Sequence, residues 1–214
     1  MSKKYTAAIV GCGGIGHAHM EGYQQFDNID VIGAVDPVET ARRQYMDEFG
    51  IPNGYASVEA MMADIKPDIV SVCVWHLLHP DMTISAARGG ARAVICEKPM
   101  AIGVGDAERM IEACEAAGTK LVISHQRRFT PGYEKARAMI RDGVIGAPNW
   151  VNCTVAEGLT NWGTHAIDGA RFVLDDPDAL WVMGAVERQT DRFERDTAIE
   201  DACLGLIQME RNIQ

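Results

Sequence analysis

Short apolar runs alternate with helical patterns along the first 124 residues of the chain. Runs typical of buried strands lie at residues 6–10, 30–35, 69–74, 93–96 and 121–124. A glycine-rich turn and a helical stretch to about residue 26 follow the first run, and further helical patterns lie at residues 39–49, 58–64, 81–88 and 106–117. Strands and helices at this spacing predict right-handed crossovers and a mostly parallel sheet covered on both faces. We therefore expect a doubly wound α/β domain over residues 1–124.

The pattern changes after residue 124. Helical patterns lie at residues 131–141 and 164–174, and strand-like runs lie at residues 150–155, 180–188 and 202–209. Only a polar loop joins the last two runs, which is typical of antiparallel neighbours. We expect residues 125–214 to form a second, α+β domain with an antiparallel sheet.

Composition and charge narrow the classes of partner. The 214 residues are 47% hydrophobic and 23% charged, which is the balance of an ordinary globular protein. The net charge of −10 would repel phosphate backbones and anionic lipids, so we expect no nucleic-acid or membrane partner. No run approaches the roughly 18 apolar residues that a membrane span needs. Six cysteines without a C-x-x-C pair favour free thiols in the cytoplasm.

The sequence G-x-G-x-x-G at residues 11–16 lies between the first predicted strand and its helix. In that position Gly11 permits a tight turn, Gly13 lets the backbone approach a pyrophosphate, and Gly16 lets helix and strand pack closely. The helix N-terminus would add amide hydrogens and a partial positive charge. The motif predicts a dinucleotide site, and the residues that we expect to contact the cofactor are Gly11, Gly13, Gly14, Ile15 and Gly16.

Asp36 ends the second predicted strand, 20 residues after Gly16. A carboxylate at this position accepts hydrogen bonds from a ribose 2′-hydroxyl and repels a 2′-phosphate. NAD is therefore favoured over NADP. Arg42 and Arg43 keep NADP as an alternative, because an arginine could neutralise that phosphate.

Glu97, Lys98 and Pro99 directly follow the apolar run at residues 93–96. Lys98 should therefore emerge at the carboxyl edge of the sheet, where doubly wound folds bind ligands. There it could orient a substrate hydroxyl and tune its acidity. The alternative interpretation is a surface salt bridge.

Histidines supply the other candidate chemistry. His165 begins a predicted helix with Asp168 three residues later, so a carboxylate could orient a ring able to take a proton from an alcohol. A histidine that only caps or packs the helix is the alternative. His76 and His79 have a spacing that suits a metal, but no Cys or carboxylate nearby completes the set, so we expect no metal site.

This combination of motifs resembles the Gfo/Idh/MocA oxidoreductases, typified by glucose–fructose oxidoreductase and inositol dehydrogenase. The matching residues are the glycine motif at residues 11–16, Asp36-Pro37, His79, Glu97-Lys98-Pro99, Gln126-Arg127-Arg128-Phe129 and Gly163-Thr164-His165 with Asp168. The resemblance implies a Rossmann domain followed by a substrate and oligomerisation domain with an open, mostly antiparallel sheet. It also implies NAD-linked oxidation or reduction at a hydroxyl carbon of a sugar, sugar acid or cyclitol.

The same resemblance implies roles for individual side chains. Lys98 and His165 would be catalytic: His165 would take the hydroxyl proton, and Lys98 would position that hydroxyl and stabilise developing negative charge. His79 and Glu97 would lie with Lys98 at the cofactor. The residues expected at the substrate, besides Lys98 and His165, are Arg128, Asn161 and Trp162.

Two departures from the family pattern leave a second function open. Many members have Asp where this chain has Asn161, and an amide cannot relay a proton. Residues 125–214 are also too few for the family's full second sheet, so exposed strand edges predict a homo-oligomer formed through the C-terminal sheet. The alternatives to a dehydrogenase are a non-catalytic NAD-binding sensor or truncated remnant, and an enzyme that recycles tightly held NAD.

Overall fold

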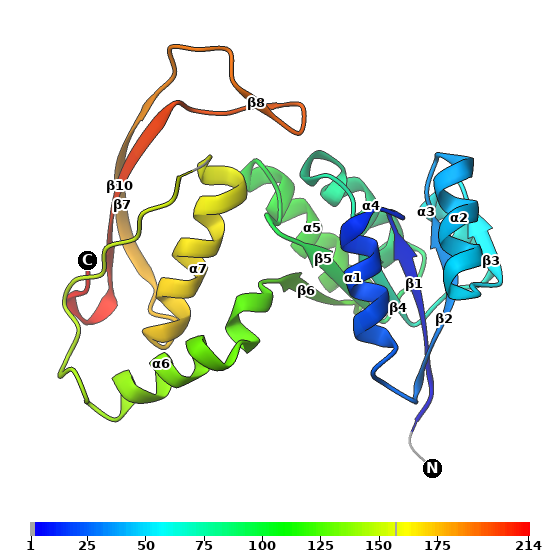
Figure 1. Ribbon diagram of the computed structural model, residues 1–214, viewed down its shortest axis with the longest axis horizontal. Helices are drawn as coiled ribbons and strands as arrows, with labels where there is room; N and C mark the ends of the chain where they lie inside the picture. The colour runs from blue at the N-terminus through cyan, green and yellow to red at the C-terminus, as the bar shows by residue number, and fades with distance from the viewer. Residues whose placement is uncertain (1–2, 157) are drawn as a thin grey trace. The chain divides into compact units, whose positions relative to one another are not determined.

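The computed structural model describes residues 3–156 and 158–214. The chain divides into two compact units, Met1–Ser124 and His125–Gln214 (Figure 1). The first unit is an α/β structure, and the second combines two longer helices with antiparallel strands. The predicted fold class is therefore confirmed.

The first unit is built on one six-stranded parallel sheet with the order β3-β2-β1-β4-β5-β6. Its strands are β1 (Tyr5–Val10), β2 (Ile29–Val35), β3 (Asn53–Tyr55), β4 (Ile69–Val72), β5 (Ala93–Glu97) and β6 (Lys120–Ser124). The strand order reverses between β1 and β4, which pair with each other. In doubly wound sheets this switch point, at the carboxyl ends of the strands, is where ligands bind.

Helices cover both faces of this sheet (Figure 1). They are α1 (Gly14–Tyr23), α2 (Glu39–Phe49), α3 (Val58–Asp64), α4 (His79–Arg88) and α5 (Val104–Ala117), with a short helix η1 (His76–Leu78) before α4. Because successive strand side chains point to opposite faces, Val10 packs with Met61 of α3, whereas Ile9 packs with Tyr23 of α1 and Tyr45 of α2. Burial on both faces explains why the strands are apolar without alternation.

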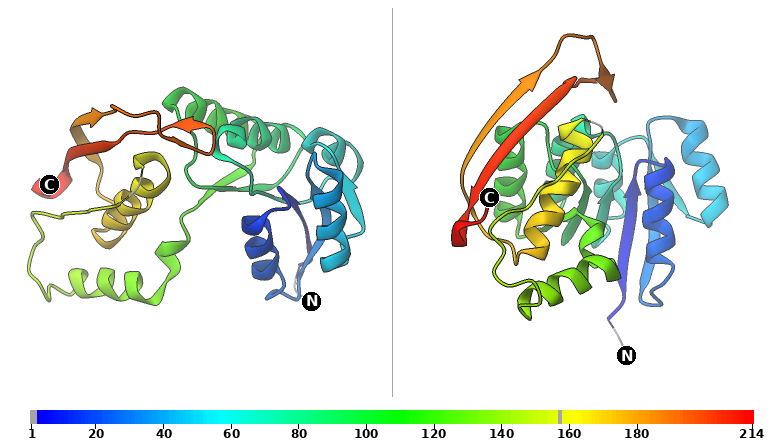
Figure 2. Two further views of the ribbon diagram at one scale, coloured as in Figure 1. Left: turned by 45° about the horizontal axis from the view of Figure 1, so that its top comes forward. Right: turned by 60° about the vertical axis from the view of Figure 1, so that its left-hand side comes forward.

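The second unit has less regular structure. Its elements are η2 (Gln126–Phe129), α6 (Pro131–Arg141), the π-helical segment η3 (Leu159–Gly163), α7 (Thr164–Val173), β7 (Ala179–Glu187), β8 (Phe193–Glu194), β9 (Thr197–Ala198), β10 (Ala202–Met209) and η4 (Glu210–Asn212). Strands β7 and β10 pair antiparallel as a long ribbon, which Figure 2 shows from two sides. A small core of Leu174, Met209 and Ile213 lies at its end.

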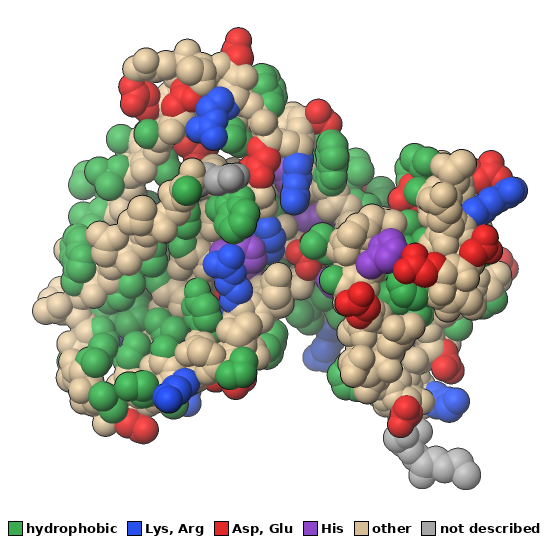
Figure 3. Space-filling model, viewed as in Figure 1, with side chains coloured by type: hydrophobic (Ala, Val, Ile, Leu, Met, Phe, Trp, Pro, Cys, Tyr) green, Lys and Arg blue, Asp and Glu red, His purple; other side chains and the backbone are tan. Residues whose placement is uncertain are grey.

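The β7–β10 ribbon exposes apolar side chains to solvent. Every residue of β7 is exposed, including Leu180, Val182 and Val186, and Leu204 of β10 is 78% exposed. Figure 3 shows hydrophobic side chains gathered along this part of the surface. The ribbon therefore has an apolar surface that its own unit leaves uncovered.

The structure differs in three places from what the sequence predicts. The strand predicted at residues 150–155 is wrong: the chain there is irregular, although Val151 donates its backbone N–H to the Gln214 carbonyl oxygen and packs against the small core at the end of the ribbon. The short strand β3 and the β8–β9 hairpin were not predicted, because strands of two or three residues have too few positions for a recognisable pattern.

None of the helices in the described residues is long and apolar enough to cross a membrane.

Candidate functional site

The glycine turn after β1 is constrained by main-chain contacts. Gly11 has a φ of +96°, and a Cβ there would lie 2.6 Å from the carbonyl oxygen of Cys73. A Cβ on Gly16 would lie 2.2 Å from the carbonyl oxygen of Gly11. Both positions therefore require glycine, the first for its backbone conformation and the second for the close approach of helix and strand.

The other two glycines of the turn face open space. A Cβ on Gly13 or Gly14 would meet nothing within 4 Å, and both residues are exposed. Gly13 is the N-cap of α1, no side chain caps that helix, and its first turn contains no acidic residue. The first-turn amides and the positive end of the helix dipole therefore suit a diphosphate, and the turn fits the pyrophosphate of a dinucleotide.

Asp36 lies directly beside this turn. Its Oδ2 accepts a hydrogen bond from the Cys12 backbone N–H at 3.1 Å, and its Oδ1 accepts one from the Val38 N–H at 2.9 Å. Arg42 donates from Nη1 to the Asp36 carbonyl oxygen at 2.5 Å, and Arg43 pairs with Glu39. The carboxylate is thus held in place, with lone pairs left to accept further hydrogen bonds. Its contact with a ribose stays a prediction.

Glu97 and Lys98 follow at the end of β5. Lys98 is half-buried, its backbone N–H donates to Glu97 Oε2 at 3.3 Å, and it precedes Pro99 through a cis peptide bond. Burial opposes ionisation of Glu97, but hydrogen bonds from His19, Ser124 and the Lys98 amide together lower the pKa of Glu97. The lowered pKa favours an ionised carboxylate at Glu97, next to the Lys98 main chain.

His79 is buried at the start of α4. Its Nδ1 lies 2.7 Å from the carbonyl oxygen of Pro99, and its Nε2 lies 3.0 Å from that of Val74. The ring joins the chain after β4 to the chain after β5, so it positions the segment that contains Lys98. A direct cofactor contact by His79 stays a prediction.

The sequence analysis did not single out a set of buried polar side chains that lies next to these residues. His19 of α1 contacts Ser71 of β4 through Nδ1 at 3.1 Å and Glu97 through Nε2 at 3.1 Å. The Tyr23 hydroxyl lies 2.7 Å from Ser71 Oγ. None of the motifs in the sequence contains His19, Ser71 or Tyr23, so no signal in the sequence pointed to this set.

In the second unit, His165 is buried in the first turn of α7. Its ring lies edge-on to those of His125 and Trp162, with centroids 6.3 Å and 6.5 Å away. Asp168, expected to orient His165, lies 3.6 Å from His125 Nδ1 and binds Arg128 at 2.6 Å. His125 is thus a neighbour of His165 that sequence reasoning missed, because nothing in the motif predicts that the two rings meet.

The three other residues expected at the substrate differ in their surroundings. Arg128 makes hydrogen bonds of 2.6 to 3.0 Å with Asp168 and Asp176, which tie η2 to α7 and the chain that follows it. Asn161 is buried and donates from Nδ2 to Glu194. Trp162 is 42% exposed. Substrate contacts by these residues stay predictions.

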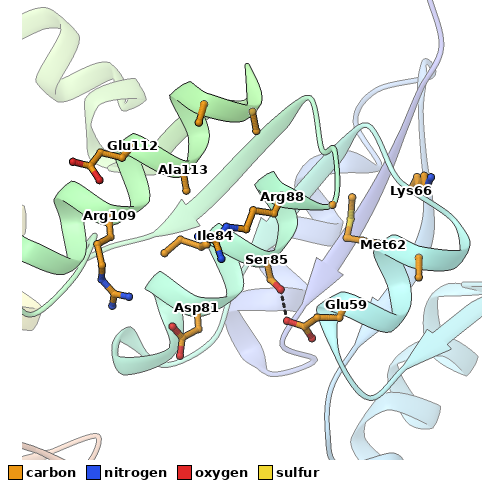
Figure 4. Close-up of a pocket in the computed structure, with 14 residues that line it drawn as sticks. Glu59, Met62, Lys66, Asp81, Ile84, Ser85, Arg88, Arg109, Glu112 and Ala113 are labelled. Carbon is orange, nitrogen blue, oxygen red and sulfur yellow. Dashed lines mark hydrogen bonds between the residues drawn. The ribbon is translucent and has the colours of Figure 1, made fainter.

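A groove of about 1200 Å³ lies elsewhere on the first unit, among α3, α4 and α5 (Figure 4). Its rim combines acids and bases such as Asp81, Arg88 and Arg109, and Glu59 accepts a hydrogen bond from Ser85 across it. None of the predicted site residues lines this groove. Among the residues that the structure describes, no group of three or more His, Cys, Asp or Glu side chains could hold a metal ion.

Comparison with known proteins places these features in a family. A family model described as "Oxidoreductase family, NAD-binding Rossmann fold" (GFO_IDH_MocA) matches residues 5–125. D-apiose dehydrogenase of Paraburkholderia graminis is 26% identical over 99% of this chain and 59% of its own length. Myo-inositol 2-dehydrogenase of Thermotoga maritima is 28% identical over 95% of this chain and 67% of its own length. This chain thus spans about three fifths to two thirds of these relatives.

A solved structure shares the fold. The WlbA dehydrogenase of Bordetella pertussis, crystallised in complex with NADH and UDP-GlcNAcA, superposes with a TM-score of 0.84 at 22% identity. The match covers 99% of this chain and 69% of that one. At this identity the likeness shows the fold.

Proposed function

Because this chain belongs to the Gfo/Idh/MocA oxidoreductase family, whose Rossmann domain binds NAD, we propose that it is an NAD-dependent dehydrogenase. The proposed reaction transfers a hydride between the cofactor and a hydroxyl carbon of a sugar, sugar acid or cyclitol. The main support is the open Gly13–Gly14 turn beside the fixed Asp36 carboxylate. Sugar and inositol dehydrogenases among the relatives support the substrate class.

In this proposal the first unit holds the dinucleotide. The amides of Gly13, Gly14 and Ile15 bind the pyrophosphate, with Gly11 and Gly16 setting the turn, and Asp36 accepts from the ribose hydroxyls. The negative charge of Asp36 disfavours a 2′-phosphate, so NAD is preferred over NADP. When bound, NAD supplies the hydride acceptor for the alcohol carbon.

Lys98 is proposed to act on the reacting hydroxyl. Its half-buried position at the end of β5 brings an ammonium group to the edge of the sheet where the glycine turn and Asp36 also lie. The ammonium donates a hydrogen bond to the hydroxyl oxygen and stabilises the negative charge that develops there. Glu97 accepts from the Lys98 amide, and His79 contacts Pro99, so both support this segment.

His165 is proposed as the base that removes the hydroxyl proton. A neutral imidazole can accept this proton near neutral pH, and burial shields the ring from water. Arg128, Asn161 and Trp162 are proposed contacts for the substrate's other hydroxyls and ring. Asn161 can hydrogen-bond a sugar but cannot relay a proton, so His165 acts without a second acid at that position.

A second copy of the chain is the proposed partner. The apolar β7–β10 ribbon favours self-association, because an exposed ribbon of this kind is costly in water. Light scattering coupled to gel filtration measures the mass, and a monomer at micromolar concentration contradicts this part of the proposal.

The alternative is a protein that binds NAD without catalysis. Asn161 favours it, because an amide cannot relay a proton. One experiment separates the two functions: NAD titration followed by tryptophan fluorescence, together with NADH formation on a panel of sugars, sugar acids and cyclitols. Turnover of any member supports the dehydrogenase, whereas binding without turnover supports the alternative. NAD that remains bound through purification would indicate internal recycling.

A further inference from the structure

His19 and Glu97 form a buried pair that joins two parts of the first unit. The His19 Nε2 to Glu97 Oε1 distance is 3.1 Å, and the side chains are 14% and 9% exposed. His19 belongs to α1, the helix that begins at the glycine turn, whereas Glu97 is the last residue of β5 and precedes Lys98. The contact therefore connects the proposed pyrophosphate helix to the proposed catalytic lysine.

The direction of the hydrogen bonds follows from the chemistry of the groups. The lowered pKa of Glu97 keeps it ionised, and an ionised carboxylate only accepts, so His19 Nε2 must hold the proton of this bond. Nδ1 of a neutral ring can then accept from the Ser71 hydroxyl, which in turn accepts from Tyr23. Each member of this buried set thus has a partner.

The other oxygen of Glu97 acts on the main chain. Glu97 Oε2 accepts from the Lys98 N–H at 3.3 Å, and Ser124 of β6 is a further donor to the carboxylate. A buried carboxylate that lost the His19 donor would have to move toward other donors or water, because burying a charge without partners is costly. Such a movement would release the Lys98 amide.

We propose that His19 is a positioning residue for catalysis, which holds the Glu97 carboxylate and thereby fixes the main chain at Lys98. This inference rests on the proposed function of Lys98. His19 itself does not touch the substrate in this scheme. Its effect is transmitted through two hydrogen bonds, one to Glu97 and one from Glu97 to the Lys98 amide.

Two isosteric variants test the proposal in the full-length chain. In His19→Gln the amide nitrogen occupies the place of Nε2 and can still donate to Glu97. In His19→Asn the amide occupies the place of Nδ1, so the contact with Ser71 is kept and that with Glu97 is lost. Tyr23→Phe serves as a control, since it removes only the far end of the set.

Three quantities are measured for each variant: hydrogen exchange of the Lys98 amide by NMR, the Kd for NAD, and kcat on a substrate found in the panel. We expect His19→Asn to speed Lys98 exchange and lower kcat by about tenfold to a hundredfold, because small displacements of a catalytic group are costly. The NAD Kd should stay within about twofold, since main-chain bonds hold the glycine turn. His19→Gln should restore both exchange and kcat, and Tyr23→Phe should change neither.

If His19→Asn and His19→Gln lose kcat equally, in parallel with a lower Tm, the proposal is overturned and the role of His19 is structural only. Unchanged Lys98 exchange in His19→Asn would also overturn it. A wild-type protein that turns over no substrate overturns the proposed function instead. In that case the exchange rates of the Lys98 amide in the wild type and the variants still show whether His19 fixes the main chain at Lys98.

Discussion

Asp36 Oδ2 accepts a hydrogen bond from the Cys12 N–H at 3.1 Å, which ties the acid at the end of β2 to the glycine turn after β1. The second oxygen accepts from the Val38 N–H, so the main chain orients both halves of the carboxylate. The donors that set this orientation all belong to the main chain of the protein. A carboxylate that is already oriented can accept hydrogen bonds from the two hydroxyls of a ribose without moving. Its preorganisation therefore favours the binding of a ribose over the binding of a group that would have to displace the acid.

Asp36→Ala should weaken NAD binding and narrow the preference for NAD over NADP. Loss of a charged acceptor costs about 1.5–3 kcal/mol, which corresponds to roughly tenfold to a hundredfold in Kd. Removal of the negative charge should at the same time favour NADP, because a 2′-phosphate is no longer repelled. Titration of both cofactors measures the ratio. Asp47 is an exposed acid on α2, and Asp47→Asn controls for the change in net charge. If the ratio of the NAD and NADP Kd values is unchanged in Asp36→Ala, Asp36 does not contact the ribose.

Gly13→Ala and Gly16→Ala should separate cofactor binding from folding. An alanine at Gly13 meets no atom within 4 Å, so the fold should be intact, while the methyl group obstructs the pyrophosphate and weakens NAD binding at least about tenfold. An alanine at Gly16 lies 2.2 Å from the Gly11 carbonyl oxygen and should cost about 1–3 kcal/mol or more of unfolding free energy. Urea unfolding and NAD titration check both variants. Normal NAD affinity in Gly13→Ala would contradict the proposed pyrophosphate position.

Sequence alone could predict the edge of the first sheet. Gly11, Asp36 and Lys98 each follow an apolar strand, and the carboxyl ends of parallel strands share one edge, so their common location needs no side-chain detail. The partners of His19 could not be predicted, because Ser71 and Glu97 are 52 and 78 residues away and neither the glycine motif nor the Glu97-Lys98-Pro99 motif relates them to His19. Only the packing of α1 on the sheet brings them together.

Side-chain partners in the second unit were also hard to predict from the sequence, because they too lie far apart along the chain. Asp168 was expected to serve His165 from its position three residues later, but its contacts include Arg128, 40 residues earlier in the chain. An arginine with several donors binds a carboxylate in a two-pronged geometry that no helical spacing reveals. Helix spacing therefore indicated a common face for His165 and Asp168 without identifying the partner of the acid.

Lys98→Met should abolish turnover without removing NAD binding. The methionine keeps the apolar part of the side chain, whereas the ammonium that stabilises the developing charge is lost, so kcat should fall about a thousandfold. NADH formation and NAD titration measure the two effects. Lys98→Arg is the matched control, because it keeps the charge with a different geometry and should be intermediate. Undiminished turnover in Lys98→Met would exclude the proposed role.

His17 should make stability depend on pH. Its hydrogen bond to the Gly13 carbonyl, and to a lesser degree that to Glu48, raises the pKa of His17 above 6.5 in the folded state, against the opposing effect of burial. The folded protein therefore binds the His17 proton more tightly than the unfolded chain does. The resulting gain in the free energy of unfolding is complete below about pH 6 and is lost as the pH rises through the folded pKa.

The size of this contribution should stay below about 1 kcal/mol, because the side chains of His17 and Glu48 are 34% and 55% exposed. Urea unfolding of the wild type and of His17→Gln checks it, since glutamine does not titrate. The difference between the two proteins should shrink from acid to alkaline pH. A difference that grows with pH would show that the histidine is not stabilised in its charged form.

Asp168→Asn should destabilise the second unit more than Asp176→Asn. Both acids bind Arg128, but the Asp168 side chain is 13% exposed and that of Asp176 is 35% exposed, so water compensates less for the loss at Asp168. Weakening a partly buried, two-pronged pair should cost about 1–3 kcal/mol at Asp168 and about 1 kcal/mol or less at Asp176. Arg141→Gln, on the exposed side of α6, should have little effect and serves as the control.

Arg128→Met distinguishes a structural clamp from a substrate contact. If the arginine mainly joins η2 to α7, the variant should lower the urea midpoint as Asp168→Asn does, because Asp168 and Asp176 both lose the guanidinium that they share. A substrate contact would instead raise KM at an unchanged midpoint. A double-mutant cycle of Arg128→Met and Asp168→Asn measures the coupling, which should be well above the error of the unfolding free energies. Additive effects would mean that the two side chains do not depend on each other, and the clamp would be excluded.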